Sequence, residues 1–210
     1  LNKHHGPVLT AEEYLEAVRV RLGCAGPTDP VPCSRCGQAL FDSSGAHAAC
    51  CACPESTRGH YGVVKELLPR FKQCDPTAEP EVTGLIPGTD LRPADILTQA
   101  LGNTVTALDV GITSPDSIRA GTDCAASMFQ RKMEYYRPYF GVLEQQNIEY
   151  IPLTWSSYGR PHSSTVTVLR TLSKRISRRR GTTTAAAVYQ SMQSAIATEI
   201  WRRAAKQVFW

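Results

Sequence analysis

Apolar residues recur at helical spacing in three stretches of the chain. From residue 58 the stripe begins at His60 and ends at Phe71, with the spacing i, i+3, i+4, i+7, i+8 and i+11, which predicts a helix buried on one side. Residues 10–22 repeat apolar side chains every four positions behind Thr10, a suitable N-cap. A C-terminal helix from about residue 183 is indicated by a third stripe: Val188, Met192, Ile196 and Ile200.

Shorter apolar runs predict strands between these helices. Two of them flank Gly102-Asn103, and a Gly-Asn pair between apolar runs is typical of a hairpin. The predicted strands span residues 82–86, 93–99, 104–112 and 148–154. The predicted helices span residue 125 to Pro138, where the helix ends or kinks, and residues 163–180. This order predicts an α/β fold with a small mixed sheet flanked by helices.

Two aspartates are placed symmetrically about the predicted hairpin turn. Asp95 and Asp109 lie seven residues before and after Gly102, so a turn centred on this glycine sets the two carboxylates directly opposite each other. Like charges in that position are destabilising. A hard divalent cation between them would offset the repulsion, since such ions take oxygen ligands.

The next helix carries Lys132, which could reach back to the two carboxylates. Two acids, a metal ion and a lysine are the groups needed for phosphodiester hydrolysis. Other interpretations stay open at this point. Asp109 could pair with Arg92 or Arg131, Asp95 could cap a turn, and Lys132 could be an ordinary solvated lysine.

These motifs occur in an order that resembles a known superfamily. The chain has Arg92-Pro93-Ala94-Asp95, then the strand Leu108-Asp109-Val110-Gly111, then Lys132 with Tyr136 four residues on. This resembles the PD-(D/E)XK nucleases, and most of all the restriction-like endonuclease domain of site-specific non-LTR retrotransposons, over roughly residues 15–180. The superfamily's usual lysine position, two residues after the second acid, is Gly111 here. The retrotransposon branch moves this lysine to the following helix, which Lys132 matches. A second helical lysine, frequent in that branch, is replaced by Tyr135.

The resemblance implies a metal-dependent DNA endonuclease. Asp95 and Asp109 would hold Mg²⁺ or Mn²⁺, with a backbone carbonyl near Val110 as a further ligand, and Lys132 would position the attacking water. Such a domain nicks target DNA in the nucleus, exposing a 3′ hydroxyl that primes reverse transcription by a neighbouring domain. Some relatives place a further ligand on the first core helix, where Glu66 is the candidate.

Five of the eight cysteines lie between residues 33 and 53. Cys33, Cys36, His47 and Cys51 form a C-x2-C-x10-H-x3-C pattern, whose ligand types and spacing suit tetrahedral zinc. Four protein ligands leave no open position, so we expect a structural site. Cys50 or Cys53 could replace Cys51. A CCHC finger also precedes the nuclease motifs in the retrotransposon family that this chain resembles.

Charge is distributed unevenly along the 210 residues. The net charge is +4, yet from Arg170 onward there are nine Lys and Arg against one acid, Glu199. A basic segment beside acidic metal ligands favours nucleic-acid binding. The resemblance implies DNA as the partner, with RNA as the alternative. No segment is apolar enough to span a membrane. The residues we expect to contact phosphates are Arg92, Lys174, Arg175, Arg178, Arg179 and Arg180.

These patterns divide the chain into three expected units. Residues 1–57 form an N-terminal helix and zinc knuckle, residues 58–180 the nuclease-like core, and residues 181–210 a C-terminal helix. Because the sequence starts without methionine, we expect it to be part of a longer polypeptide. Two other functions remain open: a catalytically inactive nuclease fold that binds nucleic acid, favoured by Gly111, and a zinc domain that docks onto a larger protein.

Overall fold

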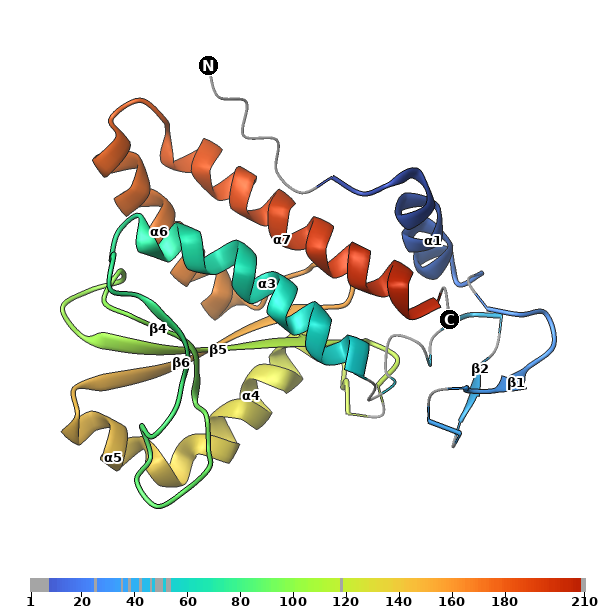
Figure 1. The fold of residues 1–210 in the computed structure, drawn as a ribbon, viewed down its shortest axis with the longest axis horizontal. Coiled ribbons are helices and arrows are strands. Elements are labelled where there is room, and N and C mark those ends of the chain that lie inside the picture. Colours follow the sequence, from blue (N-terminus) through green and yellow to red (C-terminus); the bar gives the residue numbers. More distant parts are fainter. Residues whose placement is uncertain are drawn as a thin grey trace.

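The computed structural model describes residues 8–208 except 25, 35, 38, 42, 46, 48–50, 52–53 and 118. It combines a four-stranded sheet, a minimal two-stranded sheet and helices on both faces of the larger sheet (Figure 1). In chain order the elements are α1 (Ala11–Leu22), β1 (Val31–Pro32), β2 (Leu40–Phe41), α3 (Pro54–Lys72), β3 (Glu79–Val82), β4 (Ala94–Thr98), β5 (Val105–Thr113), α4 (Cys124–Tyr136), a 3₁₀ turn (Arg137–Tyr139), α5 (Phe140–Gln145), β6 (Ile148–Ser156), α6 (Ser163–Arg180) and α7 (Ala185–Val208).

The larger sheet has the order β3-β4-β5-β6 and is mixed. The first three strands are antiparallel neighbours, while β6 runs parallel to β5. The parallel pair needs a crossover connection, which α4 and α5 provide. The expected small mixed sheet flanked by helices is therefore present.

The helices cover the two faces of the sheet as separate layers. On one face α3, α6 and α7 enclose a core that includes Phe71, Leu108 and Trp155. On the other face α4 and α5 pack over a smaller core that includes Ala107 and Tyr150. The predicted stripe of α7 is buried, since its four apolar residues are at most 4 % exposed. The C-terminal helix thus shares one core with α3, α6 and the larger sheet.

Element boundaries differ most from the sequence expectations in three places. The first strand covers residues 79–82 instead of 82–86, because Leu85 and Ile86 leave the sheet and pack into the smaller core. Pro80 is tolerated because β3 is an edge strand. Helix α3 begins at Pro54, four residues earlier than expected. The hairpin loop spans residues 99–104 and is longer than a two-residue turn.

The N-terminal elements lie at one end of the molecule. Helix α1 has the expected Thr10 cap, with Glu13 completing a capping box. It packs beside α7, and the β1–β2 hairpin extends beyond it (Figure 1). None of the described helices has the length and apolar character of a membrane span.

Candidate active site and metal centres

Three carboxylates form a row across neighbouring strands of the sheet. The β4–β5 register pairs Ile96 with Leu108, and one step further it sets Asp95 opposite Asp109, as the turn centred on Gly102 predicts. The β3–β4 register pairs Pro80 with Ile96 and Val82 with Ala94, which sets Glu81 opposite Asp95 on the other side. Opposed like charges repel, so this row requires compensating positive charge.

Asp95 occupies the centre of the row and binds neighbours on both sides. One of its oxygens accepts a hydrogen bond from the Val110 backbone N–H at 2.6 Å, which takes the place of a backbone partner where β4 begins. The other oxygen lies 3.1 Å from His60 Nε2 on α3. Asp95 is therefore held by β5 and α3 together, and the turn-capping alternative does not describe its contacts.

Asp109 is buried and is contacted by two donors. The Lys132 amine on α4 lies 2.5 Å from one oxygen, and the Tyr150 hydroxyl on β6 donates to the other at 2.6 Å. Burial raises the pKa of the Asp109 carboxyl, and the nearby Lys132 charge opposes this rise. Burial and Asp109 together raise the pKa of Tyr150 far above its usual value. The ion-pair partner of Asp109 is thus Lys132, and neither Arg92 nor Arg131 takes this role.

Gly111 leaves the space through which Lys132 reaches the sheet. A Cβ atom built at Gly111 would lie 2.8 Å from Lys132 Cε and 3.2 Å from Met128 Cγ, closer than side chains normally approach. The bare face of Gly111 and the stem of Lys132 therefore occupy complementary positions. Both residues could be singled out from the sequence. Their contact could not be predicted, because it depends on how α4 packs on β5.

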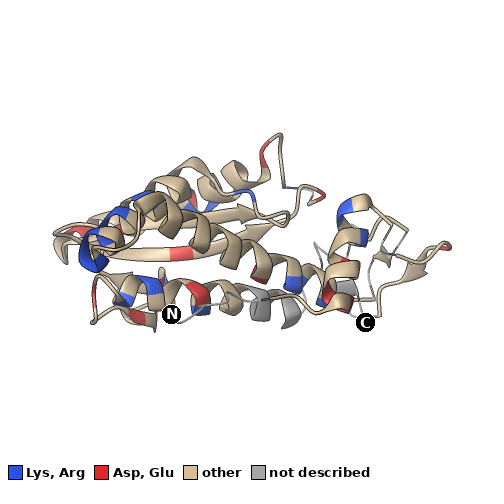
Figure 2. Ribbon diagram, turned by 90° about the horizontal axis from the view of Figure 1, so that it is seen from above, with Lys and Arg blue, Asp and Glu red and all other residues tan. Residues whose placement is uncertain are grey.

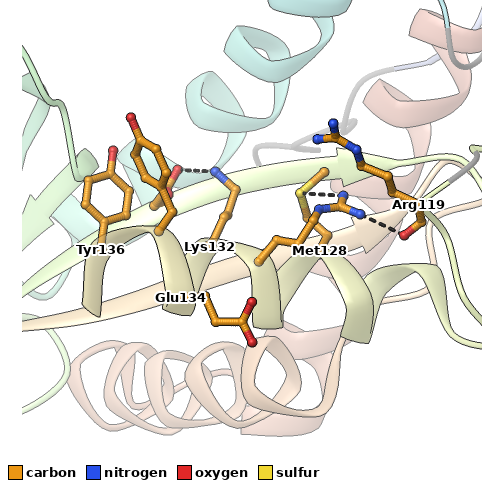
Figure 3. Close-up of a pocket in the computed structure, with 8 residues that line it drawn as sticks. Arg119, Met128, Lys132, Glu134 and Tyr136 are labelled. Carbon is orange, nitrogen blue, oxygen red and sulfur yellow. Dashed lines mark hydrogen bonds and ion pairs between the residues drawn. The ribbon is translucent and has the colours of Figure 1, made fainter. Parts of the chain in front are cut away.

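An open groove of about 670 Å³ lies over Asp109 and Lys132, and its other lining residues come from α4 and the loop before it. Figure 3 shows Lys132 reaching from α4 to its carboxylate partner, with Arg119 near the other end of the groove. Arg131 donates to the Arg119 carbonyl at 2.7 Å. Three cations, Arg119, Arg131 and Lys132, line the groove against the two acids Asp109 and Glu134. The remaining positive charge suits a phosphodiester. Neither Arg119 nor Arg131 was among the residues expected from the sequence to contact nucleic acid.

His60 and Glu81 complete the surroundings of Asp95. Burial would lower the pKa of His60, but its hydrogen bond and attraction to Asp95 outweigh burial and raise it. Burial and repulsion from Asp95 raise the pKa of Glu81. Ligand atoms of His60, Glu81 and Asp95 all lie within 4.8 Å of one another, and Glu66 is outside this group of described residues. We expected His60 only as a packed residue and did not single out Glu81.

The predicted phosphate-binding residues lie at two different places. Arg92 is exposed, and its charge lies close enough to Glu81 to oppose the rise in the pKa of that carboxyl. The Arg92 backbone carbonyl accepts a hydrogen bond from the Tyr136 hydroxyl. The basic end of α6 lies instead beside the hairpin loop, because Arg175 donates to the Ala100 carbonyl and Arg179 to the Gln73 carbonyl. Figure 2 shows blue Lys and Arg positions gathered at that end of the molecule. Lys174, Arg178 and Arg180 are exposed there.

The second cluster is the predicted zinc knuckle. Ligand atoms of Cys33, Cys36, His47 and Cys51 lie within 4.8 Å of one another. The Cys33–Cys51 sulfur distance is 3.9 Å and the Cys36 sulfur lies 3.4 Å from His47 Nε2. Tetrahedral zinc–sulfur bonds imply sulfur–sulfur edges of about 3.8 Å.

This cluster can therefore bind zinc. Gly37 has φ +63°, the left-handed conformation that the tight knuckle requires. Burial, together with the Cys33 and Cys36 thiols, raises the pKa of Cys51 to about 12 when no metal is bound. Cys50 and Cys53, the alternative ligands, lie outside the described residues.

Comparisons with protein families, with curated proteins and with solved structures gave no match to this chain. The interpretation of the site therefore rests on its own residues and geometry.

Proposed function

We propose that this chain is a metal-dependent DNA endonuclease domain. The observation that carries the proposal is the arrangement around Asp109. This acid faces Asp95 across β4 and β5, pairs with Lys132 from the following helix, and lines a groove that also holds Arg119 and Arg131. Two acids, one lysine and a cationic groove are the groups that phosphodiester hydrolysis needs.

Asp95 and Asp109 would hold a hard divalent cation between β4 and β5. Both offer carboxylate oxygens, and their repulsion across the strands favours a cation between them. Mg²⁺ or Mn²⁺ held by these residues would lower the pKa of a bound water and offset charge on the phosphate. The Val110 N–H keeps Asp95 in place, as its 2.6 Å hydrogen bond indicates.

The remaining residues bind and orient the substrate. Arg119 and Arg131 would attract the DNA backbone into the groove, and Lys132 would orient the attacking water and stabilise the charge on the phosphate oxygens. Water adds to phosphorus, the bond to the 3′ oxygen breaks, and that oxygen leaves as a hydroxyl. A nick with a 3′ hydroxyl could prime reverse transcription by a neighbouring domain, as in the nuclear retrotransposon proteins that the motifs resemble.

Plasmid nicking tests this function. Supercoiled DNA is incubated with the purified chain and Mg²⁺ or Mn²⁺, with and without EDTA. We expect nicked product with either metal and none with EDTA. Asp109→Asn should lower the initial rate at least about a hundredfold, since it removes a metal ligand and the partner of Lys132. Asp116→Asn, which changes an exposed acid in the loop after β5, should retain the wild-type rate.

The second candidate is a nuclease fold that binds nucleic acid without cutting it. The observation that favours it is that Lys132 and Tyr150 each donate to one of the two Asp109 oxygens, which leaves less capacity for a metal ion. Salt-dependent plasmid binding with no metal-dependent nicking by the wild-type chain would establish this alternative.

A further inference from the structure

Glu81 is held in an unfavourable state when no cation is bound. Its backbone has φ +53°, a strained left-handed conformation that few residues other than glycine adopt. Its Oε1 atom is buried and has no hydrogen-bond partner among the described residues. Its carboxylate also faces that of Asp95 across the β3–β4 register. The strained backbone, the unpaired oxygen and the repulsion from Asp95 all occur at this one residue.

His60 supplies a third ligand, an imidazole nitrogen, beside these two carboxylates. Its Nε2 atom lies 3.1 Å from Asp95, and ligand atoms of all three residues lie within 4.8 Å of one another. The residues come from α3, β3 and β4, so the fold brings them together from separate parts of the chain. A cation among them would give the buried Glu81 oxygen a partner and relieve its repulsion from Asp95.

We propose that His60, Glu81 and Asp95 form a second divalent-cation site, separate from the Asp95–Asp109 pair and sharing Asp95 with it. One imidazole nitrogen with two carboxylates suits Mn²⁺ and similar transition-metal ions better than Mg²⁺, which prefers oxygen ligands. Three protein ligands leave positions open to water or a phosphate oxygen, unlike the four ligands of the zinc knuckle. The site stands on its own geometry and does not require nuclease activity.

Mn²⁺ binding to the zinc-loaded full chain tests the site. Free Mn²⁺ is counted by electron paramagnetic resonance during titration without DNA. We expect the wild-type chain to bind one ion more than Glu81→Gln or His60→Gln, or to bind it at least about tenfold more tightly. Glu79→Gln, an exposed acid two residues away on the same strand, is the matched control and should bind as the wild type does.

A spin-echo measurement tests the nitrogen ligand directly. Bound Mn²⁺ should show modulation from a coordinated imidazole nitrogen, which His60→Gln removes and Asp109→Asn retains. Unchanged Mn²⁺ number and affinity in both Glu81→Gln and His60→Gln would overturn the site. This result would leave the nuclease proposal intact, whereas absent nicking with Glu81-dependent Mn²⁺ binding would remove the nuclease proposal alone.

Glu81→Gly separates a metal ligand from a structural residue. Glycine accepts the positive φ without strain, and the substitution removes both the unpaired oxygen and the repulsion. We therefore expect a higher midpoint of thermal unfolding without Mn²⁺, together with loss of the extra ion. A lower midpoint would contradict the proposal, because it would show that Glu81 stabilises the metal-free fold.

Discussion

Gly111 has no side chain, and the Lys132 stem lies in the space that a side chain would occupy. In the PD-(D/E)XK pattern that the sequence resembles, lysine usually occupies the position of Gly111, and here the Lys132 stem passes over that position. A lysine supplied by α4 and a lysine supplied by β5 would compete for the same space. The position of Lys132 beside Asp109 therefore depends on the absence of a side chain at Gly111.

Gly111→Ala should displace Lys132 from Asp109. Because the crowded atom belongs to a flexible side chain, folding should be little affected, while nicking should fall about tenfold or more. Initial nicking rates and thermal unfolding, measured on the same preparation, test both parts. Gly141→Ala is the control, since a Cβ there meets nothing within 4 Å.

A lysine-swap variant tests whether the strand can supply the lysine in place of α4. Gly111→Lys combined with Lys132→Ala supplies the lysine from the strand, and it should nick faster than Lys132→Ala alone. A Gly111→Ala chain with the wild-type rate would show that the position of the Lys132 stem does not matter.

At the scale of elements, Asp75 fastens the segment after α3 to the end of β4. It accepts hydrogen bonds from the Thr77 N–H and hydroxyl, the Thr98 hydroxyl and the Gln99 N–H, at 2.6–3.1 Å. Burial alone would raise the pKa of this carboxyl, but these hydrogen bonds outweigh burial and lower it. These hydrogen bonds hold the end of β4, the strand of Asp95, close to the end of α3, the helix of His60.

Asp75→Asn should destabilise the fold by about 2 kcal/mol near neutral pH, since it removes the charge that strengthens these hydrogen bonds. A lowered folded pKa means that the stabilisation is complete above the unfolded value of about 4 and is lost as pH falls through the folded value. Urea unfolding of both proteins at several pH values tests this. The difference should shrink below about pH 4, and a constant difference would contradict it.

Much of the element order followed from the sequence, because helical stripes and the hairpin symmetry about Gly102 are local signals. The opposition of Asp95 and Asp109 followed from the same symmetry, while the reach of Lys132 was expected from its place on the following helix. Glu81 could not be found this way, since its strand contains Pro80 and lacks alternation, and its register depends on a distant pairing. Tyr150 was not predicted as a site residue, because a tyrosine in an apolar strand is usually a packing residue. Its hydroxyl nevertheless donates to Asp109.

At the scale of the whole molecule, the zinc knuckle is a small unit beside a large core. Its two strands have two residues each, and its buried cluster among the described residues consists of cysteines. Because the described residues of this unit bury little apolar surface, we expect it to depend on a metal for its stability. The sheet and its helices have their own cores on both faces.

Cys33→Ser combined with Cys36→Ser should therefore remove about one zinc ion per chain and expose residues 26–53 to proteolysis. The thermal transition of the α/β core should remain. Metal analysis, limited proteolysis and near-ultraviolet circular dichroism of buried Trp155 test these outcomes. Cys24→Ser, at an exposed free cysteine, should retain zinc, and loss of the core transition with the zinc would contradict two separable units.

The most direct test of the nuclease account is the chemistry of the nick itself. Plasmid treated with the wild-type chain and Mg²⁺ should carry nicks that a DNA polymerase extends without prior end repair, because hydrolysis leaves a 3′ hydroxyl. The same treatment with Asp109→Asn should give no extension. Wild-type protein that binds the plasmid yet leaves no extendable nick, or an Asp109→Asn protein that nicks equally well, would contradict the account.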